Sequence, residues 1–284
     1  MIVITGANGA LNGATVGHLL TLVPAEQIGV SVRDVAKAQS LADRGVRVRR
    51  GSYDDPEALL QAFEGADQVL LVSSNDPGDT MPLHRVAIET AVKAGAHRVL
   101  YTSHQHIGAE TPFRPAQVHA GTEAMLADCG VAWTSLRNGF YAHSLDWMLG
   151  PWRETGVIAA PADGPASWTD RGDEAEAAAM ILARDGSFDG PVTLTASAAP
   201  TFDDIATIAS ELTGRDISRV VMDDDEWVAA RVEHGSPEPM ARMLLGFFLA
   251  ARQGRFAEVD PTLGELLGRE PQSVRDLLAG QAAA

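Results

Sequence analysis

The stretch that decides the fold is Met1-Ile2-Val3-Ile4-Thr5-Gly6-Ala7-Asn8-Gly9-Ala10-Leu11-Asn12-Gly13. Its first residues are apolar and largely β-branched, which favours a strand in the core of a sheet. Glycines follow this strand at once, and Val16, Leu19 and Leu20 then mark the apolar face of a helix. A strand, a glycine-rich loop and a helix in this order are typical of a turn that holds a dinucleotide pyrophosphate. The stretch therefore predicts a dinucleotide-binding turn, and the alternative is a plain strand-to-helix turn.

The glycines of this loop have separate expected roles. Gly6 permits the tight turn after the strand, and Gly9 lets backbone N–H groups approach the pyrophosphate at the start of the helix. We expect the loop to contact the cofactor through six residues: Gly6, Asn8, Gly9, Ala10, Leu11 and Asn12.

Short β-branched runs alternate with amphipathic stretches of helix length over residues 1–136. This alternation is typical of a parallel sheet covered by helices, and we expect strands at about 1–5, 28–33, 46–50, 67–73, 97–102 and 131–136. The sequence therefore predicts an α/β fold, a Rossmann-like doubly wound parallel sheet. After Arg137 the pattern becomes irregular, which suggests a small, mostly helical C-terminal lobe. We expect a cofactor-binding core over residues 1–150 and a substrate-binding lobe over 151–284, partly integrated with the core.

The end of the second expected strand, Val30-Ser31-Val32-Arg33, indicates which dinucleotide binds. Folds that bind NAD place a carboxylate about 20 residues beyond the glycine loop, whereas an arginine there accommodates the 2′-phosphate of NADP. The guanidinium of Arg33 can hold such a phosphate with two hydrogen bonds. Because Asp34 follows, the alternative is that Arg33 pairs with Asp34. The sequence favours NADP(H) as the cofactor.

Polar and aromatic residues follow the later expected strands, at the edge where open α/β sheets bind ligands. Candidates for the pocket are Ser73, Ser74 and Asn75 after the fourth strand, Ser103 and His104 after the fifth, and Asn138, Phe140 and Tyr141 after the sixth. Of these we expect Ser73, Ser74 and Asn138 to contact the cofactor.

The composition limits the partners of the chain. A net charge of −16 argues against nucleic acid, because phosphate binding needs a basic surface. The longest apolar stretch, residues 243–251, falls short of the roughly 20 residues that a bilayer requires, so we expect no membrane span. The single cysteine, Cys129, and the lack of a basic leader before the first strand predict a cytoplasmic protein. We expect a small-molecule substrate and a monomer or homodimer.

A Rossmann-like chain of this length suggests the short-chain dehydrogenase/reductase superfamily, whose usual catalytic pair is Tyr-x-x-x-Lys. The pair is absent, because the residues four places after Tyr53, Tyr101 and Tyr141 are Glu57, Gln105 and Leu145. The two lysines, Lys37 and Lys93, lie in expected early helices away from the chemistry. The sequence therefore argues against an ordinary alcohol dehydrogenase.

Four further motifs carry a resemblance: Gly51-Ser52-Tyr53-Asp54-Asp55-Pro56-Glu57, Tyr101-Thr102-Ser103, His119-Ala120-Gly121-Thr122-Glu123 and Leu136-Arg137-Asn138-Gly139-Phe140-Tyr141. Over residues 1–260 the chain resembles the atypical NmrA-like branch of the superfamily, and within it the type-2 NAD(P)H:quinone oxidoreductases and triphenylmethane reductases. The resemblance implies a Rossmann core, NADP(H), and reduction of a quinone or a conjugated aromatic acceptor.

Two residues depart from this family pattern. Asn12 replaces the third glycine of a Gly-x-x-Gly-x-x-Gly loop and is followed by Gly13, so we expect its side chain to crowd the helix against the sheet or to shift the pyrophosphate. Ser52 replaces an aspartate near the expected adenine pocket. Both departures bear on the affinity for the cofactor rather than on the fold.

The missing Tyr-x-x-x-Lys pair also bears on the acceptor. Reduction of an isolated ketone yields a localised alkoxide that needs a positioned acid, whereas the charge of a reduced quinone spreads over its ring. An enzyme without the pair can therefore work by holding a quinone-like ring against the nicotinamide.

The candidates for catalysis are His119, Tyr141 and Ser103. His119 lies where the lysine of related enzymes falls, and we expect it to bond the nicotinamide ribose or to relay a proton; the alternative is a structural histidine. Tyr141 is expected to donate to a quinone oxygen or, alternatively, to pack under the lobe. His104 and His106 lack a third ligand at metal spacing, so we expect no metal.

Two functions stay open at this point. The first is an NADPH-dependent reductase of a quinone or extended aromatic compound, whose hydroquinone product could react with oxygen and so support the oxygenation of an aromatic polyketide in secondary metabolism. The second is a non-catalytic NADP-binding redox sensor or regulator of the NmrA type. Nucleotide-sugar epimerisation fits poorly without the tyrosine and lysine.

Overall fold

The computed structural model describes residues 1–74 and 80–282, which form two compact units. The units interleave along the chain, and each is described by itself. The first comprises Met1–His104, Val118–Asn138 and Gly172–Leu194, and the second comprises Gln105–Gln117, Gly139–Arg171 and Thr195–Ala284. The chain enters the second unit before residue 150 and returns to the first after it, which differs from the division at residue 150 that the sequence suggests.

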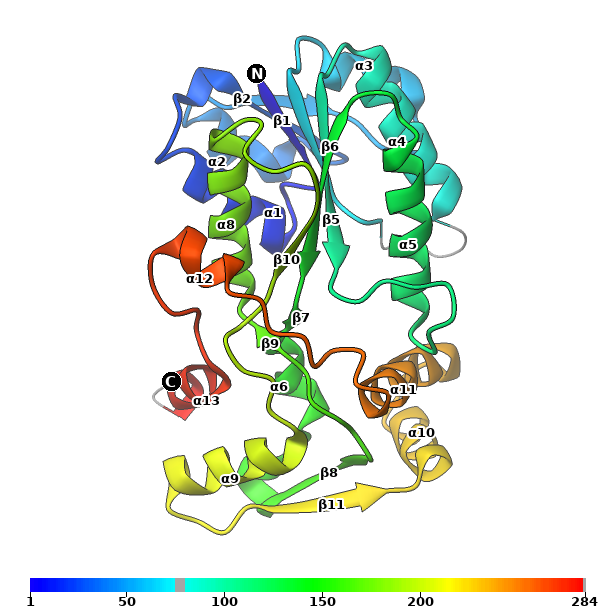
Figure 1. Ribbon diagram of the computed structural model, residues 1–284, viewed down its shortest axis with the longest axis vertical. Helices are drawn as coiled ribbons and strands as arrows, with labels where there is room; N and C mark the ends of the chain where they lie inside the picture. The colour runs from blue at the N-terminus through cyan, green and yellow to red at the C-terminus, as the bar shows by residue number, and fades with distance from the viewer. Residues whose placement is uncertain (75–79, 283–284) are drawn as a thin grey trace. The chain divides into compact units, whose positions relative to one another are not determined.

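The first unit is built on a sheet of seven parallel strands in the order β10-β6-β5-β4-β1-β2-β3 (Figure 1). Its strands are β1 (Ile2–Thr5), β2 (Ile28–Val32), β3 (Arg47–Arg50), β4 (Gln68–Leu71), β5 (Arg98–His104), β6 (Ala132–Asn138) and β10 (Gly190–Leu194). The strand order reverses between β1 and β4, which is the topology of a doubly wound sheet. The Rossmann-like fold that the sequence predicts is confirmed, and the six expected strands are all present.

The strand β10 is a seventh member of the sheet that the sequence pattern does not predict. It pairs with β6 from Gly190 opposite Thr134 to Leu194 opposite Asn138. Its first residues, Gly190 and Pro191, normally signal a turn. A proline cannot donate a hydrogen bond to a neighbouring strand, but β10 is the edge of the sheet, where a proline is tolerated.

Helices cover both faces of this sheet. They are α1 (Ala10–Leu19), α2 (Gln39–Ala42), α3 (Pro56–Phe63), α4 (Met81–Lys93), α5 (Arg114–Ala127) and α8 (Arg171–Ala183), with the short 3-10 turns η1 (Ala25–Gln27) and η2 (Ala36–Ala38). The helices α3, α4 and α5 lie on one face, and α1 and α8 lie on the other (Figure 1). Because both faces are covered, β1, β2 and β4 are buried along their whole length.

Several helices begin at side-chain caps. The side chain of Asp55 accepts a hydrogen bond from the N–H of Ala58 at 3.1 Å, and Pro56 occupies the first turn of α3. The helix α9 (Phe202–Thr213) begins at a capping box in which Thr201 and Asp204 bind each other's backbone N–H. These caps satisfy N–H groups that the helices themselves leave without partners.

The second unit is mostly helical. Besides α9, its helices are α6 (Leu145–Met148), α7 (Trp152–Thr155), α10 (Asp224–Glu233), α11 (Glu238–Arg252), α12 (Thr262–Leu267) and α13 (Val274–Ala282), with the 3-10 turn η3 (Ala142–Ser144). Two parallel strand pairs join them: β7 (Phe140–Tyr141) with β9 (Trp168–Thr169), and β8 (Val157–Pro161) with β11 (Ser218–Met222). Aromatic rings pack against one another in its core. The ring of Phe247 stacks on that of Phe256 with centroids 5.3 Å apart, and its centroid lies 4.4 Å from that of Phe140.

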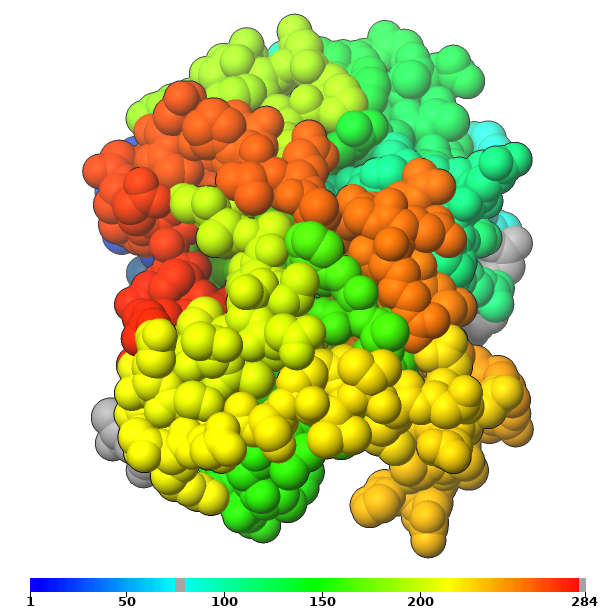
Figure 2. Space-filling view, turned by 60° about the horizontal axis from the view of Figure 1, so that its bottom comes forward, coloured from blue at the N-terminus to red at the C-terminus, as the bar shows by residue number. Residues whose placement is uncertain are grey.

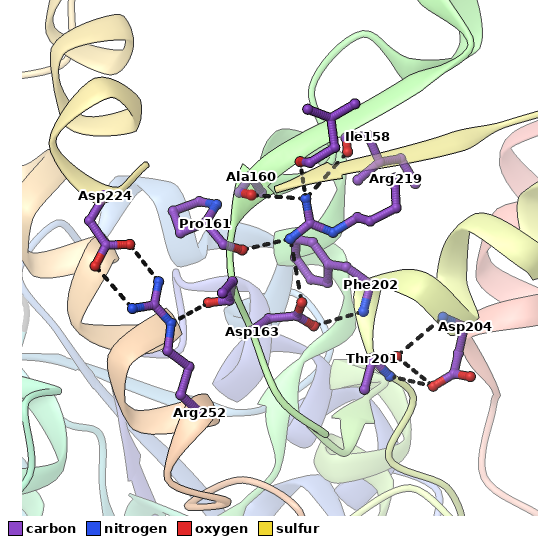
Figure 3. Close-up of polar contacts among 12 residues, drawn as sticks. Ile158, Ala160, Pro161, Asp163, Thr201, Phe202, Asp204, Arg219, Asp224 and Arg252 are labelled. Atoms are coloured by element: carbon purple, nitrogen blue, oxygen red, sulfur yellow. Dashed lines mark hydrogen bonds and ion pairs between the residues drawn. The ribbon is translucent and has the colours of Figure 1, made fainter. Parts of the chain in front are cut away.

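A buried ion pair fastens β8, β11 and α9 of the second unit together (Figure 3). The Arg219 side chain of β11 is 4% exposed, and its Nη2 lies 3.4 Å from Oδ1 of Asp163. Its Nη1 donates to the carbonyl oxygen of Ala160 at 2.8 Å. The other oxygen of Asp163 accepts the N–H of Phe202 at 2.8 Å, at the first turn of α9. Asp163 therefore supports three elements of this unit.

The surface of the second unit carries apolar side chains on β11. Val220 and Val221 are 47% and 61% exposed, and the yellow part of the chain that contains β11 faces the viewer in Figure 2. None of the helices in the described ranges combines the length and the apolar composition that a membrane span requires.

Candidate functional site

A cavity of about 410 Å³ opens in the first unit, where β1, β2 and β4 end. It is lined by Thr5, Gly6, Asn8, Gly9, Ser31, Val32, Arg33, Asp34, Lys37, Gly51, Ser52, Tyr53, Val72, Ser73 and Ser74. The strand order reverses beside β1, and open α/β sheets bind ligands at such a point. The structure thus brings together Gly6, Asn8, Gly9, Arg33, Ser73 and Ser74 from the residues expected to contact a cofactor.

The glycine loop forms one wall of the cavity. Gly6 has a φ of +65°, and a Cβ there would lie 2.7 Å from Cγ1 of Val72. A Cβ at Gly9 would lie 3.2 Å from the carbonyl oxygen of Gly6. No side chain caps α1 at its N-cap Gly9, so the N–H groups of Ala10 and Leu11 in the first turn can bind an anion. The loop has the geometry of a pyrophosphate cradle.

Asn12, which the sequence predicts to crowd α1 or to shift the pyrophosphate, makes a hydrogen bond to the end of β1. It is 1% exposed, and its Nδ2 donates to the carbonyl oxygen of Thr5 at 2.8 Å, which ties α1 to the end of β1. The close approach falls one residue later, where a Cβ at Gly13 would lie 2.9 Å from the carbonyl oxygen of Ala7. The Oδ1 of Asn12 is buried with no hydrogen-bond partner among the described residues, and a cofactor contact of Asn12 stays a prediction.

Two cations line the cavity after β2. Arg33 and Lys37 are both exposed there, although the sequence places Lys37 in a helix away from the chemistry. The Nζ of Lys37 lies 3.9 Å from Oδ2 of Asp34, and Oδ1 of Asp34 accepts the N–H of Ala36 at 3.1 Å. The Nδ2 of Asn8 donates to the carbonyl oxygen of Asp34 at 2.9 Å and so joins the glycine loop to this turn. An arginine and a lysine at one cavity suit a phosphate dianion.

Tyr53 is a cavity residue that the sequence reasoning misses as a binding residue. Its hydroxyl lies 2.8 Å from Oγ1 of Thr5 and donates to the carbonyl oxygen of Val72 at 2.9 Å. Burial raises the pKa of Tyr53 above its ordinary value, so the phenol stays protonated. The signal that could have found it is its place just after the third strand, beside Ser52, which lines the same cavity.

Ser103, a candidate catalytic residue, binds a buried carboxylate. It is 4% exposed, and its Oγ donates to Oε1 of Glu123 at 2.8 Å. Ser135 donates to the same oxygen at 2.7 Å, and Arg137 binds Oε2 at 2.7 Å. The hydroxyl proton of Ser103 therefore already has an acceptor, and a catalytic role for Ser103 stays a prediction.

His119, the second candidate, pairs with a buried tyrosine. Its Nδ1 lies 2.8 Å from the hydroxyl of Tyr101, and both side chains are buried. Burial, with His104 and His84 nearby, lowers the pKa of His119 to about 3, so the ring is neutral at physiological pH. Burial also raises the pKa of Tyr101 to about 12. This burial agrees with a structural histidine, and a contact of His119 with a ribose stays a prediction.

Asn138 and Tyr141 are not among the residues that line the cavity. Asn138 ends β6 and is 2% exposed, and its Oδ1 has no hydrogen-bond partner among the residues that the structure describes. Tyr141 belongs to the second unit, where its ring stacks on that of His143 with centroids 5.5 Å apart. Asn75 lies outside the described residues. In residues 1–74 and 80–282, no three His, Cys, Asp or Glu side chains are placed to hold a metal ion.

The doubly wound sheet, the uncapped glycine loop and the cavity with two cations define a dinucleotide-binding protein. Residues 1–267 match the NmrA-like family, and the chain belongs to this family. The resemblance that the motifs carry is confirmed.

The proteins of known sequence and structure to which the chain is similar include reductases. Quinone oxidoreductase 2 of Escherichia coli (strain K12) is 35% identical over 269 residues, which are 94% of this chain and 94% of that protein. The crystal structure of the E. coli NADPH-dependent quinone oxidoreductase with NADPH has a TM-score of 0.93 at 32% identity, and the match covers 99% of this chain and 100% of that one. The triphenylmethane reductase of Citrobacter sp. with NADP(H) has a TM-score of 0.90 at 31% identity, with 99% and 100% covered.

Proposed function

We propose that the chain is an NADPH-dependent reductase that transfers hydride to a quinone or an extended aromatic acceptor. The observation that carries the proposal is the cavity of the first unit, which combines an uncapped glycine loop with the cations Arg33 and Lys37. Membership of the NmrA-like family supports the oxidoreductase class, as does the similarity to reductases of quinones and triphenylmethane dyes.

The residues of the cavity fit NADPH. The N–H groups of Ala10 and Leu11 suit the pyrophosphate, and Arg33 and Lys37 suit the 2′-phosphate that distinguishes NADPH from NADH. Ser31 also lines the cavity, and its Oγ is buried with no hydrogen-bond partner in the described part of the chain. When bound, the nicotinamide supplies the hydride.

The acid–base groups of the first unit suit a quinone as the acceptor. Ser103 and His119 are hydrogen-bonded to Glu123 and Tyr101, and the chain has no Tyr-x-x-x-Lys pair. The oxygens of a reduced quinone are weak bases, so water can protonate them without a positioned acid. The contribution of the protein is then to bind the two rings and orient them, which turns a bimolecular encounter into a reaction within a complex.

The test is steady-state oxidation of NADPH by the purified chain with a panel of quinones and triphenylmethane dyes. We expect oxidation that depends on the acceptor and consumes one NADPH per quinone reduced. The matched control is Gly9→Val, whose branched side chain occupies the place of the pyrophosphate; it should abolish turnover and keep the native circular dichroism. A wild-type chain that binds NADPH and reduces no acceptor would overturn the reductase proposal.

We further propose that the hydroquinone product reacts with O2, one oxygen atom entering the ring as a hydroxyl and the other leaving as water with the two electrons and two protons of the hydroquinone. The reductase would in this way support the oxygenation of an aromatic polyketide in secondary metabolism. Oxygen uptake during quinone turnover that yields a hydroxylated quinone tests this extension, and uptake that yields only hydrogen peroxide would contradict it. We also propose a cytoplasmic protein that is a monomer or homodimer, which light scattering of the purified chain and fractionation of cells expressing it would test.

The second candidate is a non-catalytic sensor that binds NADP and regulates a partner. The hydrogen bonds of Ser103 and His119 to buried protein groups favour it, because neither side chain is poised for proton transfer in the described first unit. Tight NADPH binding without oxidation by any acceptor in the panel would establish the sensor over the reductase.

A further inference from the structure

Consecutive backbone N–H groups after β4 bind side chains from other elements. The N–H of Val72 donates to Oγ1 of Thr5 in β1 at 2.9 Å. The N–H of Ser73 donates to Oγ1 of Thr102 in β5 at 3.0 Å. Because β4 ends at Leu71, these threonines take the place of strand partners and hold the chain where it lines the cavity.

The next N–H group in this run, that of Ser74, binds a side chain outside the sheet. It donates to Nε2 of His84, on α4, at 2.9 Å. His84 is 2% exposed. Its ring lies edge-on to those of Tyr53 and Tyr101, with centroids 6.3 Å and 5.5 Å apart. Tyr53 itself lines the cavity. The ring of His84 is therefore fixed by packing as well as by its hydrogen bonds.

The contacts of His84 define its tautomer. Its Nε2 accepts the N–H of Ser74, so this nitrogen carries no proton. Its Nδ1 lies 2.8 Å from Oγ1 of Thr122, whose hydroxyl donates to the carbonyl oxygen of Val118 at 2.9 Å. The proton of the ring is therefore on Nδ1 and points at Thr122. Burial lowers the pKa of His84 to about 4, which agrees with a neutral ring.

We propose that His84 is a positioning residue for the dinucleotide: its ring, protonated on Nδ1, holds the Ser74 backbone in the wall of the cavity, and cofactor affinity depends on this bond. The inference rests on the proposed function, since it takes the cavity to bind NADPH. Without His84 the N–H of Ser74 loses its acceptor, and the wall must shift or leave a polar group unsatisfied. His84 acts on the backbone rather than on the 2′-phosphate, so it serves NADPH and NADH alike.

The hydrogen bond can be measured directly by NMR of the wild-type chain labelled with nitrogen-15. We expect a scalar coupling between the amide nitrogen of Ser74 and Nε2 of His84, and a proton on Nδ1. Both signals are independent of NADPH and of activity. A ring protonated on Nε2, or no coupling across the bond, would overturn the inference.

Variants of His84 test the consequence for binding. In His84→Phe, which keeps a ring and loses the acceptor, the Kd values of NADPH and NADH should rise by the same factor, roughly three- to tenfold. His84→Gln offers a carbonyl oxygen to Ser74 and should recover part of the affinity. The control is Ile88→Ala, which empties a buried position of the same helix; it should lower Tm and leave both Kd values unchanged.

The outcomes of these titrations separate the two proposals. Wild-type Kd values in His84→Phe, or the same rise in Ile88→Ala, would overturn the positioning role while NADPH binding stands. If the wild type binds neither dinucleotide, the proposed function fails and this inference fails with it. Should His84→Phe not fold, His84→Gln and the NMR measurement still decide.

Discussion

The hydroxyl of Ser103 donates to Oε1 of Glu123 at 2.8 Å, and Arg137 balances the charge of that carboxylate at 2.7 Å. Glu123 is 5% exposed, so its charge depends on these partners rather than on water. A serine held in this way joins β5 to the buried carboxylate of α5, and its hydroxyl proton already has an acceptor.

We therefore predict that Ser103→Ala affects stability more than turnover. Quinone reduction should fall by less than about tenfold, whereas the loss of a positioned acid costs about 10²–10⁴-fold. The free energy of unfolding should fall by about 1–2 kcal/mol, because a buried carboxylate loses a donor. Ser135→Ala is the matched control, since Ser135 binds the same oxygen at 2.7 Å. A hundredfold loss of turnover in Ser103→Ala alone would make Ser103 the acid.

The two cations of the cavity should discriminate between the nicotinamide dinucleotides. Arg33→Ala should raise the Kd of NADPH by about ten- to a hundredfold and leave that of NADH nearly unchanged, because only NADPH offers a phosphate to the guanidinium. Lys37→Ala should also raise the Kd of NADPH, by a smaller factor. Arg44→Ala, which removes an exposed arginine outside the cavity lining, is the control. Equal losses for both dinucleotides in Arg33→Ala would assign Arg33 a structural role.

The buried ion pair between Asp163 and Arg219 should contribute far more to stability than the half-buried pair between Asp224 and Arg252 beside it in Figure 3. Asp163→Ala leaves Arg219 buried without its counterion and should lower the free energy of unfolding by about 3–5 kcal/mol. Asp224→Ala breaks the pair with Arg252, whose side chains are 33% and 30% exposed, and should cost about 1 kcal/mol or less. Urea denaturation of both variants measures the difference, and similar losses would contradict it.

Acid should weaken the native state through the buried histidines. The pKa values of His84 and His119, about 4 and about 3, lie below the ordinary value of 6.5. Between the folded and unfolded pKa values the unfolded chain binds more protons than the folded one. The contribution of the two histidines to stability is therefore complete above pH 6.5 and is lost as the pH falls towards about 4 for His84 and about 3 for His119. Each ring contributes up to about 1.4 kcal/mol per pH unit in this window.

Denaturant unfolding between about pH 7 and pH 5 measures this slope. The carboxyl of Asp204, whose pKa is lowered from 3.8 by its bonds to Thr201, titrates below this range and does not disturb it. His84→Gln should reduce the slope by about one proton. A variant with the wild-type slope would show that the folded and unfolded chains protonate His84 to the same extent.

The sheet could be predicted from the sequence because a contiguous run of residues marks each strand. Runs such as Ile2–Thr5 and the glycines after them are contiguous, and the structure confirms the strands that they predict. The strand β10 escaped prediction because Pro191 reads as a turn and is tolerated only at a sheet edge, which is a property of the whole sheet.

The site was less predictable than the sheet. Gly6, Gly9 and Arg33 have a recognisable spacing, and all three line the cavity. The bond between Ser74 and His84 depends on how α4 packs on the sheet, and no pattern in the sequence signals it. The same holds for Lys37, whose position follows from the turn that Asp34 makes after β2.

The measurement that most directly tests a quinone reductase is the rate of NADPH oxidation with benzoquinone relative to that with cyclohexanone, at matched concentrations. Because the chain has no Tyr-x-x-x-Lys pair, a localised alkoxide has no positioned acid, whereas a reduced quinone needs none. We predict that benzoquinone is reduced faster by at least about 10²-fold. Comparable rates with the two acceptors would contradict the prediction and would show that the chain contains a general acid.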